Sequence, residues 1–359
     1  MSNITNFKPN WAIHPGQDVL EFIKFNDWTN REFAFRTGLH ENTIGKILKG
    51  HDKITPEIAE KFARVFGMKA SFFINLQTLY EESLPRQIRN EEEDLLKILP
   101  YPEMAKLGWV CKTTKIEEKL KNSYGFLGIS SLLNLGNVGA GKIAFRKKET
   151  PNFSKESLTC WLRKGEIDFK KDAESLPPFN IIKLDKSVNE IRKLTVKNFS
   201  EIKTELVNSL KESGVCLSLN AKLTNSCVNG ASRWMNNNIL IQISDSGKKE
   251  DIFWFTLFHE IGHALKHLPT AKKTEFVDLD NGETNLQEDE ADIFAQEALI
   301  SDKLYQGFVK NKNFGSISLQ RFASEIGVDV GIIAGRLCKD KNISFNYAHG
   351  NKFRKKLEF

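Results

Sequence analysis

The sequence predicts an α+β protein in which an all-helical N-terminal domain precedes a small antiparallel sheet, a histidine-bearing helix and a helical C-terminal part. Three observations support this fold class. Apolar residues recur at helical spacing from Gln17 to about Tyr80, residues 215–219 and 238–244 are β-prone runs, and an apolar helical stretch runs from Asp251 to about His267. A chain of 359 residues exceeds what one compact core usually supports, so we expect several domains.

The composition is that of a folded protein. Hydrophobic residues make up 40% of the chain and charged residues 27%, which argues against a collagen-like or wholly disordered protein. No apolar run reaches about 18 residues, and the start lacks a basic segment followed by an apolar one. We therefore expect a cytoplasmic protein with no membrane partner. The five cysteines are widely spread without a CxxC pair, which predicts reduced thiols.

The N-terminal domain, predicted at residues 1–82, has the layout of a helix-turn-helix between Thr29 and Gly50. Ala34 allows close contact between the two helices, and Gly38 permits the sharp turn between them. Three apolar residues are expected to anchor the second helix to the core: Leu39, Ile44 and Ile47.

Four outward positions of that second helix are predicted to face the major groove of DNA: Glu41, Asn42, Thr43 and Lys46. Asn42 suits pairing with adenine, and Thr43 or Lys46 suits a phosphate or a base edge. A single unit of this kind binds weakly, so the expected complex is a homodimer on a two-fold DNA operator. The alternative is a helical bundle for protein contact, because this domain carries no large excess of basic residues.

Three further parts are predicted beyond residue 82. They are a linker and mixed helical region at 83–200, a core with the paired histidines at 201–300, and a helical C-terminal region at 301–359. The first boundary is placed in the acidic, polar stretch 81–94, which contains Pro85. Glycine-rich turns interrupt the middle region, and its pattern indicates no function.

The apolar helical stretch contains an HExxH pattern at His259, Glu260 and His263. Residues four apart lie one turn apart on a helix, so both histidines can direct a nitrogen at one ion about 2.0–2.1 Å away. In this motif the histidines bind zinc, and the glutamate takes a proton from the water that attacks a peptide carbonyl. The bulky apolar neighbours disfavour the alternative of two core histidines bonded to the backbone.

A catalytic zinc site needs a third protein ligand. His267 lies a turn too far along the helix, and Pro269 occupies the position of a possible third histidine. Glu288 and Asp292 lie on the buried side of a later predicted helix, so we expect Glu288 to bind the metal and Asp292 to accept a hydrogen bond from a ligand histidine. Glu290 points away from that side and is the less favoured ligand. These ligands suit Zn²⁺, although manganese or iron fits them with less preference.

Two sets of residues resemble known families. His14-Pro-Gly-Gln, the helix-turn-helix and Phe72-Phe73-Ile-Asn75 resemble HigA-type antitoxins of the XRE repressor class. Phe253-Trp-Phe-Thr-Leu-Phe-His-Glu-Ile-Gly-His263 and the later Glu288-Asp-Glu-Ala-Asp-Ile-Phe-Ala295 resemble the ImmA/IrrE metallopeptidases. The usual glutamine at the start of the first helix of the pair is Asn30 here, which with Glu41 indicates modest or operator-specific DNA affinity.

The second resemblance implies a minimal gluzincin fold and cleavage of repressor proteins. It assigns His259, His263 and Glu288 as zinc ligands and Glu260 as the base. A C-terminal segment with Arg336 also matches the family. Arg336 suits either carboxylate binding or packing with a surface ion pair, and packing is the favoured interpretation.

Together these features predict a DNA-binding regulator whose zinc metalloendopeptidase, latent or active, cuts a specific protein: a repressor or toxin partner, or the chain itself. Strand 238–244 is the expected edge for an extended substrate. The alternative is a non-enzymatic antitoxin or transcriptional repressor. In that case zinc is structural, and the C-terminal half binds a toxin or a signal.

Overall fold

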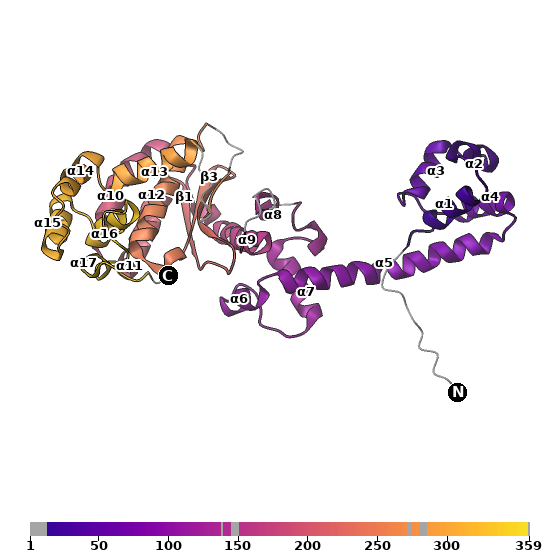
Figure 1. The fold of residues 1–359 in the computed structure, drawn as a ribbon, viewed down its shortest axis with the longest axis horizontal. Helices are drawn as coiled ribbons and strands as arrows, with labels where there is room; N and C mark the ends of the chain where they lie inside the picture. The colour runs from indigo at the N-terminus through magenta and orange to yellow at the C-terminus, as the bar shows by residue number, and fades with distance from the viewer. Residues whose placement is uncertain (1–12, 138, 145–150, 271–274, 280–285, 358–359) are drawn as a thin grey trace. The chain divides into compact units, whose positions relative to one another are not determined.

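The computed structural model describes residues 13–137, 139–144, 151–270, 275–279 and 286–357. The chain divides between Leu95 and Leu96 into two compact units (Figure 1). Residues 81–94 are helical, because their many glutamate and arginine side chains are good helix formers. The boundaries predicted at residues 82, 200 and 300 stay predictions. Among the described residues, every helix is too short or too polar to span a bilayer.

The N-terminal unit consists of helices packed around aromatic rings. Threonine side chains cap two of the helices, since the Thr29 hydroxyl accepts from the Glu32 N–H and Thr55 from the Ile58 N–H. Gly38 ends α2 at a φ of 63°, a left-handed conformation that favours glycine. The helices are α1 (Gly16–Phe25), α2 (Asn30–Thr37), α3 (Glu41–Leu48), α4 (Pro56–Phe66) and α5 (Ala70–Ile98).

The second unit begins with helices that lead to a sheet. They are α6 (Tyr101–Lys106), α7 (Ile116–Leu127), α8 (Gly139–Ala144), α9 (Lys155–Asp172), α10 (Ile181–Lys193) and α11 (Phe199–Lys211), with short 3₁₀ turns η1 (Leu132–Asn134), η2 (Ala173–Ser175) and η3 (Leu194–Val196). The helix α9 lies against the sheet and carries a buried carboxylate, Glu166. Two guanidinium groups bind that carboxylate, Arg163 at 2.6 Å and Arg233 at 3.1 Å.

The sheet has four strands in the order β1-β3-β2-β4: β1 (Val215–Asn220), β2 (Val228–Met235), β3 (Asn238–Ser244) and β4 (Glu275–Leu279). The prediction of a purely antiparallel sheet was wrong, because β1 and β3 run parallel. β3 turns back from β2 and inserts between β2 and β1, an order that alternating residues along a strand do not reveal.

Both faces of β3 are covered, which explains its continuous apolar sequence. Ile239, Ile241 and Ile243 join the core that contains α12 (Glu250–Lys266). Leu240 packs with Phe169 of α9 on the opposite face. The prediction that 238–244 forms an edge was therefore wrong, because β3 is hydrogen-bonded on both sides. In the described sheet β1 and β4 are the outer strands.

Further helices complete the second unit. They are α13 (Leu286–Leu299), α14 (Asp302–Lys310), α15 (Ser316–Ile326), α16 (Val330–Lys339) and α17 (Ala348–Asn351), and a 3₁₀ turn, η4 (Ser246–Lys248), precedes α12. Two of these helices, α13 and α16, contact α12. Figure 1 shows α13 lying beside α12. The last described residues return to the start of α12, where Arg354 binds the buried carboxylate of Asp251 at 2.8 Å.

Candidate metal centre and DNA-binding helix

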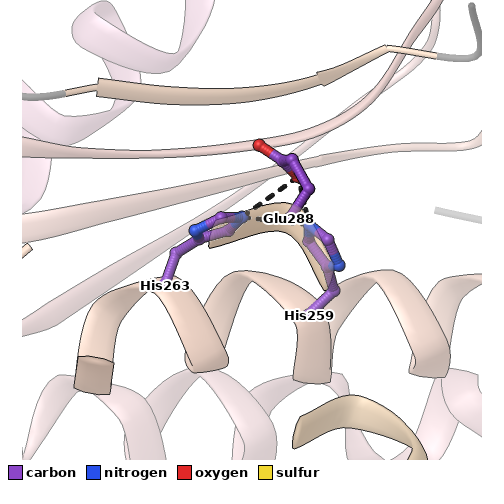
Figure 2. Close-up of side chains that lie close together, drawn as sticks. All are labelled: His259, His263 and Glu288. Atoms are coloured by element: carbon purple, nitrogen blue, oxygen red, sulfur yellow. Dashed lines mark hydrogen bonds and ion pairs between the residues drawn. The ribbon is translucent and has the colours of Figure 1, made fainter. Parts of the chain in front are cut away.

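Two helices bring three potential metal ligands together (Figure 2). His259 and His263 lie one turn apart on α12, and Glu288 lies near the start of α13. The Nε2 atoms of the two histidines are 3.0 Å apart, and the Oε2 atom of Glu288 lies 3.0 Å from the first and 3.3 Å from the second. Three donor atoms from separate turns thus converge on one point.

This triangle fits a tetrahedral zinc ion. Ligands about 2.0–2.1 Å from a tetrahedral centre stand roughly 3.3 Å from one another, close to the distances in the cluster. Two imidazoles and one carboxylate are also the donor set of many catalytic zinc sites, which leave one position open. His259 and His263 are buried, whereas Glu288 is partly exposed, so the cluster meets solvent on the side of Glu288.

The charges around the cluster favour a cation. Burial acts to lower the pKa of His259, but hydrogen bonds to Asp292 and Glu288 raise it to about 11. Burial acts to raise the pKa of Glu288, and hydrogen bonds from the two histidines lower it to about 2. Carboxylates thus surround two imidazoles, an arrangement whose negative potential a divalent ion can neutralise.

The structure places Asp292 where a partner for a ligand histidine is needed. Its Oδ1 atom lies 2.8 Å from Nδ1 of His259, the ring nitrogen that faces away from the cluster. A carboxylate accepts only, so this contact places a proton on Nδ1 and leaves Nε2 as the ring nitrogen that faces the cluster.

Glu260 lies beside the cluster, fully buried under the sheet. Neither of its carboxylate oxygens reaches a hydrogen-bond partner among the described residues. Burial raises the pKa of this carboxyl to about 8, although the charge of His259 acts in the opposite direction. A side chain on Gly230 of β2 would place a Cβ atom only 2.5 Å from its Oε1, so glycine there makes room for the carboxylate.

Several contacts of this centre were not predicted from the sequence. The ring of Phe276, on β4, stacks on the ring of His263 at 4.1 Å. His267, the C-cap residue of α12, is buried with its Nδ1 atom 3.0 Å from Nδ1 of His263, and Glu290 binds its other nitrogen. The four-residue spacing from His263 to His267 could have predicted the contact between these two side chains. No pattern near His263 in the sequence could have predicted that β4 packs on it.

The side chain of Arg336, on α16, packs against neighbouring residues. Its Nη1 donates to the carbonyl of Ile300 at 2.6 Å, and its guanidinium lies 3.8 Å from the ring centre of Tyr305. Asp302 and Asp340 are within ion-pair distance. These contacts agree with the packing interpretation of this residue.

The predicted DNA-facing residues lie together on α3. Glu41, Asn42 and Lys46 are exposed and Thr43 is half-buried, while Ile44 and Ile47 of the same helix are fully buried. His40 caps the helix, since its Nδ1 atom accepts from the Asn42 N–H at 3.2 Å. The Lys46 ammonium lies 4.0 Å from Asp52, an exposed contact that a DNA phosphate can replace.

Comparison with protein families gives two matches. Residues 26–73 match the family model described as a helix-turn-helix, and residues 228–337 match the model described as an IrrE N-terminal-like domain, which represents a family of peptidases. Comparison with curated proteins gives no match.

Among solved structures, the chain is similar to an addiction module antidote protein of the HigA family from Coxiella burnetii. The two are 27% identical over a segment that covers 23% of this chain and 91% of that protein, with a TM-score of 0.22. The two family matches enclose α3 and the His259–His263 helix, respectively. By these two family matches, the chain carries a helix-turn-helix domain, a kind of domain that binds DNA, ahead of a peptidase-like domain that matches the IrrE N-terminal-like model.

Proposed function

We propose that this protein is a transcriptional regulator whose zinc-dependent endopeptidase cleaves one specific protein, a repressor or toxin partner or the chain itself. The observation that carries the proposal is the convergence of His259, His263 and Glu288 beside an unpaired buried carboxylate, Glu260. A buried carboxylate without a partner costs stability, so its presence beside three metal ligands is best explained by a chemical role.

His259, His263 and Glu288 would hold a zinc ion, which would supply a Lewis acid for the activation of water and the polarisation of a peptide carbonyl. Glu260 has the properties of the base. Its raised pKa of about 8 suits a group that takes a proton from the attacking water and delivers it to the departing amine. Asp292 holds the ring of His259 in place through its Nδ1 atom.

Metal content tests the site. Elemental analysis of the purified full chain should give about one zinc per chain, and His263→Ala and Glu288→Ala should both lose it. His51→Ala, which alters an exposed histidine of the N-terminal unit, is the matched control. Zinc that is absent from the wild type, or retained in both site variants, contradicts the proposal.

The burial of Glu260 also favours a second candidate, a non-enzymatic antitoxin or repressor in which zinc only stabilises the fold. Glu260→Gln separates the two. The enzyme should lose cleavage of its partner, measured by gel and mass spectrometry, while it keeps zinc. A regulatory phenotype that is unchanged by this substitution favours the antitoxin.

DNA binding is proposed to use a homodimer that presents two copies of α3 to an operator. Asn42→Ala should lower affinity for the preferred operator by about 1–3 kcal/mol and relax its base preference. Lys46→Ala should weaken binding to all sequences and reduce its salt dependence. Fluorescence anisotropy at several salt concentrations measures both effects, with Lys24→Ala on α1 as control. Equal effects of all three substitutions would remove α3 from the interface.

A further inference from the structure

A second histidine–carboxylate pair lies behind the candidate metal centre. His267 is buried at the end of α12, and its two ring nitrogens face different partners. Its Nδ1 atom lies 3.0 Å from Nδ1 of His263, and its Nε2 atom lies 2.9 Å from Oε2 of Glu290. The Phe276 ring lies against both imidazoles, with ring centres 4.1 Å from His263 and 5.4 Å from His267. The proposed cleavage mechanism uses neither His267 nor Glu290.

Of the proton arrangements that these contacts allow, one leaves Nε2 of His263 able to bind a metal. A carboxylate accepts only, so His267 must carry its proton on Nε2 to donate to Glu290. The Nδ1 atom of a neutral His267 is then an acceptor. His263 must therefore carry its own proton on Nδ1, which leaves its Nε2 atom unprotonated and aimed at His259 and Glu288. That is the form of imidazole that binds a metal through Nε2.

The two ligand histidines are thus held by different means. His259 donates directly to the carboxylate of Asp292 at 2.8 Å. For His263 the corresponding carboxylate is Glu290, and His267 stands between them as an intermediate acceptor and donor. The side chain of His263 is only 1% exposed, so water cannot readily replace His267 as the acceptor for its Nδ1–H group.

We infer that His267 and Glu290 are positioning residues of the metal centre, which fix the tautomer and the ring orientation of His263. This inference rests on the proposed zinc site. Asp292 orients His259 by direct contact, and Glu290 is inferred to orient His263 indirectly, through His267. Outer partners of ligand histidines typically change metal affinity by about 10–100-fold when they are removed. The role is therefore measurable without any knowledge of the substrate.

The test is the zinc affinity of the full chain, measured by competition with a chromophoric chelator. His267→Ala should weaken binding by about 10–100-fold, because the Nδ1–H group of His263 loses its acceptor. His267→Asn should recover most of this loss, since the amide oxygen of asparagine stands where Nδ1 of histidine stood, two bonds from Cβ. Glu290→Ala should weaken binding by about tenfold, because the tautomer of His267 is no longer fixed.

Asp289→Ala is the matched control, because Asp289 is an exposed carboxylate beside Glu290 on α13. The visible spectrum of the cobalt-substituted protein is a second measure, and it should change for His267→Ala and Glu290→Ala but not for the control. If His267→Ala does not fold by circular dichroism, Glu290→Ala decides, since its side chain is 46% exposed and its removal leaves the core intact.

Three results separate the possibilities. Weaker zinc binding in His267→Ala or Glu290→Ala, with recovery in His267→Asn, supports the inference. A wild type that binds zinc with the same affinity and the same cobalt spectrum as the folded variants overturns the inference and leaves the proposed function standing. A wild type that binds no zinc overturns the proposed metal site, and the inference falls with it.

Discussion

The two units bury different kinds of side chain. The N-terminal unit packs rings against rings, as in Phe33, whose ring centre lies 5.1 Å from that of Phe62 and 5.0 Å from that of Phe66. In the second unit, several charged groups are buried as well, including Glu166, Arg233 and Asp251, whereas Glu92 is the buried charged residue in the described part of the N-terminal unit. Each of these three in the second unit has an oppositely charged partner, whereas Glu260 is buried with none within hydrogen-bonding distance in the described part.

This difference separates structural charges from the charge that the proposed chemistry uses. A ring packed against rings is held by non-directional attraction, so a similar apolar group can replace it at modest cost. A buried charge is stable only with its partner, so the loss of either member is costly. Glu260 is an exception to this rule, and it lies beside the three potential metal ligands. The substitutions described next test the contrast between the two units.

The largest loss of stability should follow Glu166→Gln, which keeps the size of the side chain and removes its charge. The buried Arg233 and the partly buried Arg163 would then both lack this negative partner. The free energy of unfolding of the second unit should fall by about 3–5 kcal/mol, measured by urea-induced unfolding of the full chain. Glu174→Gln alters an exposed carboxylate just past the end of α9 and is the control. Equal stability of the two variants would contradict the contrast.

Arg354→Ala should be the next most costly substitution. It leaves the carboxylate of Asp251, whose side chain is 4% exposed, without its guanidinium partner. We expect a loss of about 3 kcal/mol in the same unfolding transition. Arg321→Ala, which breaks an exposed pair with Glu325 on α15, should change stability by about 0–1 kcal/mol. If Arg354→Ala were as stable as the wild type and only Arg321→Ala lost stability, the pair of Arg354 with Asp251 would not hold the C-terminal residues against α12.

Phe33→Leu should cost much less, although Phe33 is fully buried at the centre of the N-terminal unit. Leucine keeps the site apolar and fills most of its volume, so we expect a loss of about 1–1.5 kcal/mol. The effect should appear in the unfolding of the N-terminal unit and leave the transition affected by Glu166→Gln unchanged. Phe35→Leu, at a position 89% exposed, is the control. A loss as large as that of Glu166→Gln would show that the two cores are equally sensitive.

Glu260→Gln should have the smallest effect on stability and the opposite sign. It replaces an unpaired buried carboxyl by a neutral amide of the same shape, so we expect no change or a gain of about 1 kcal/mol. Chelator-treated protein should be used in this measurement, so that zinc binding does not contribute. A clear loss of stability would show that Glu260 has a structural role.

The sequence allowed prediction of those features that depend on neighbours along the chain. The helical face shared by His259 and His263, and that shared by Glu288 and Asp292, follow from the four-residue spacing on a helix, and the structure brings all four side chains together. The C-terminal region predicted to be helical, residues 301–359, contains α14, α15, α16 and α17. The functional roles of these residues stay predictions.

Features that depend on distant segments were missed. The strand β4 is short and lies far along the chain from its partner β2, and the alternation within β3 does not reveal which strands flank it. The partnership of Glu166 with Arg233 joins residues 67 positions apart. No short sequence pattern predicts these pairings, because the segments meet only when the sheet forms. The acidic stretch at 81–94, where the first boundary was placed, lies within the helix α5.

The return of the C-terminal residues to the start of α12 has a consequence for synthesis on the ribosome. Leu357 donates its N–H to the carbonyl of Lys248, and Lys355 accepts at its own carbonyl from the N–H of Glu250. The metal-bearing helix therefore completes its packing only after residue 357 has left the exit tunnel. The N-terminal unit can fold hundreds of residues earlier, as domains generally do in order of synthesis. The helix-turn-helix domain of a nascent chain is then able to fold before the peptidase-like domain is assembled, an order that protease digestion of arrested chains would reveal.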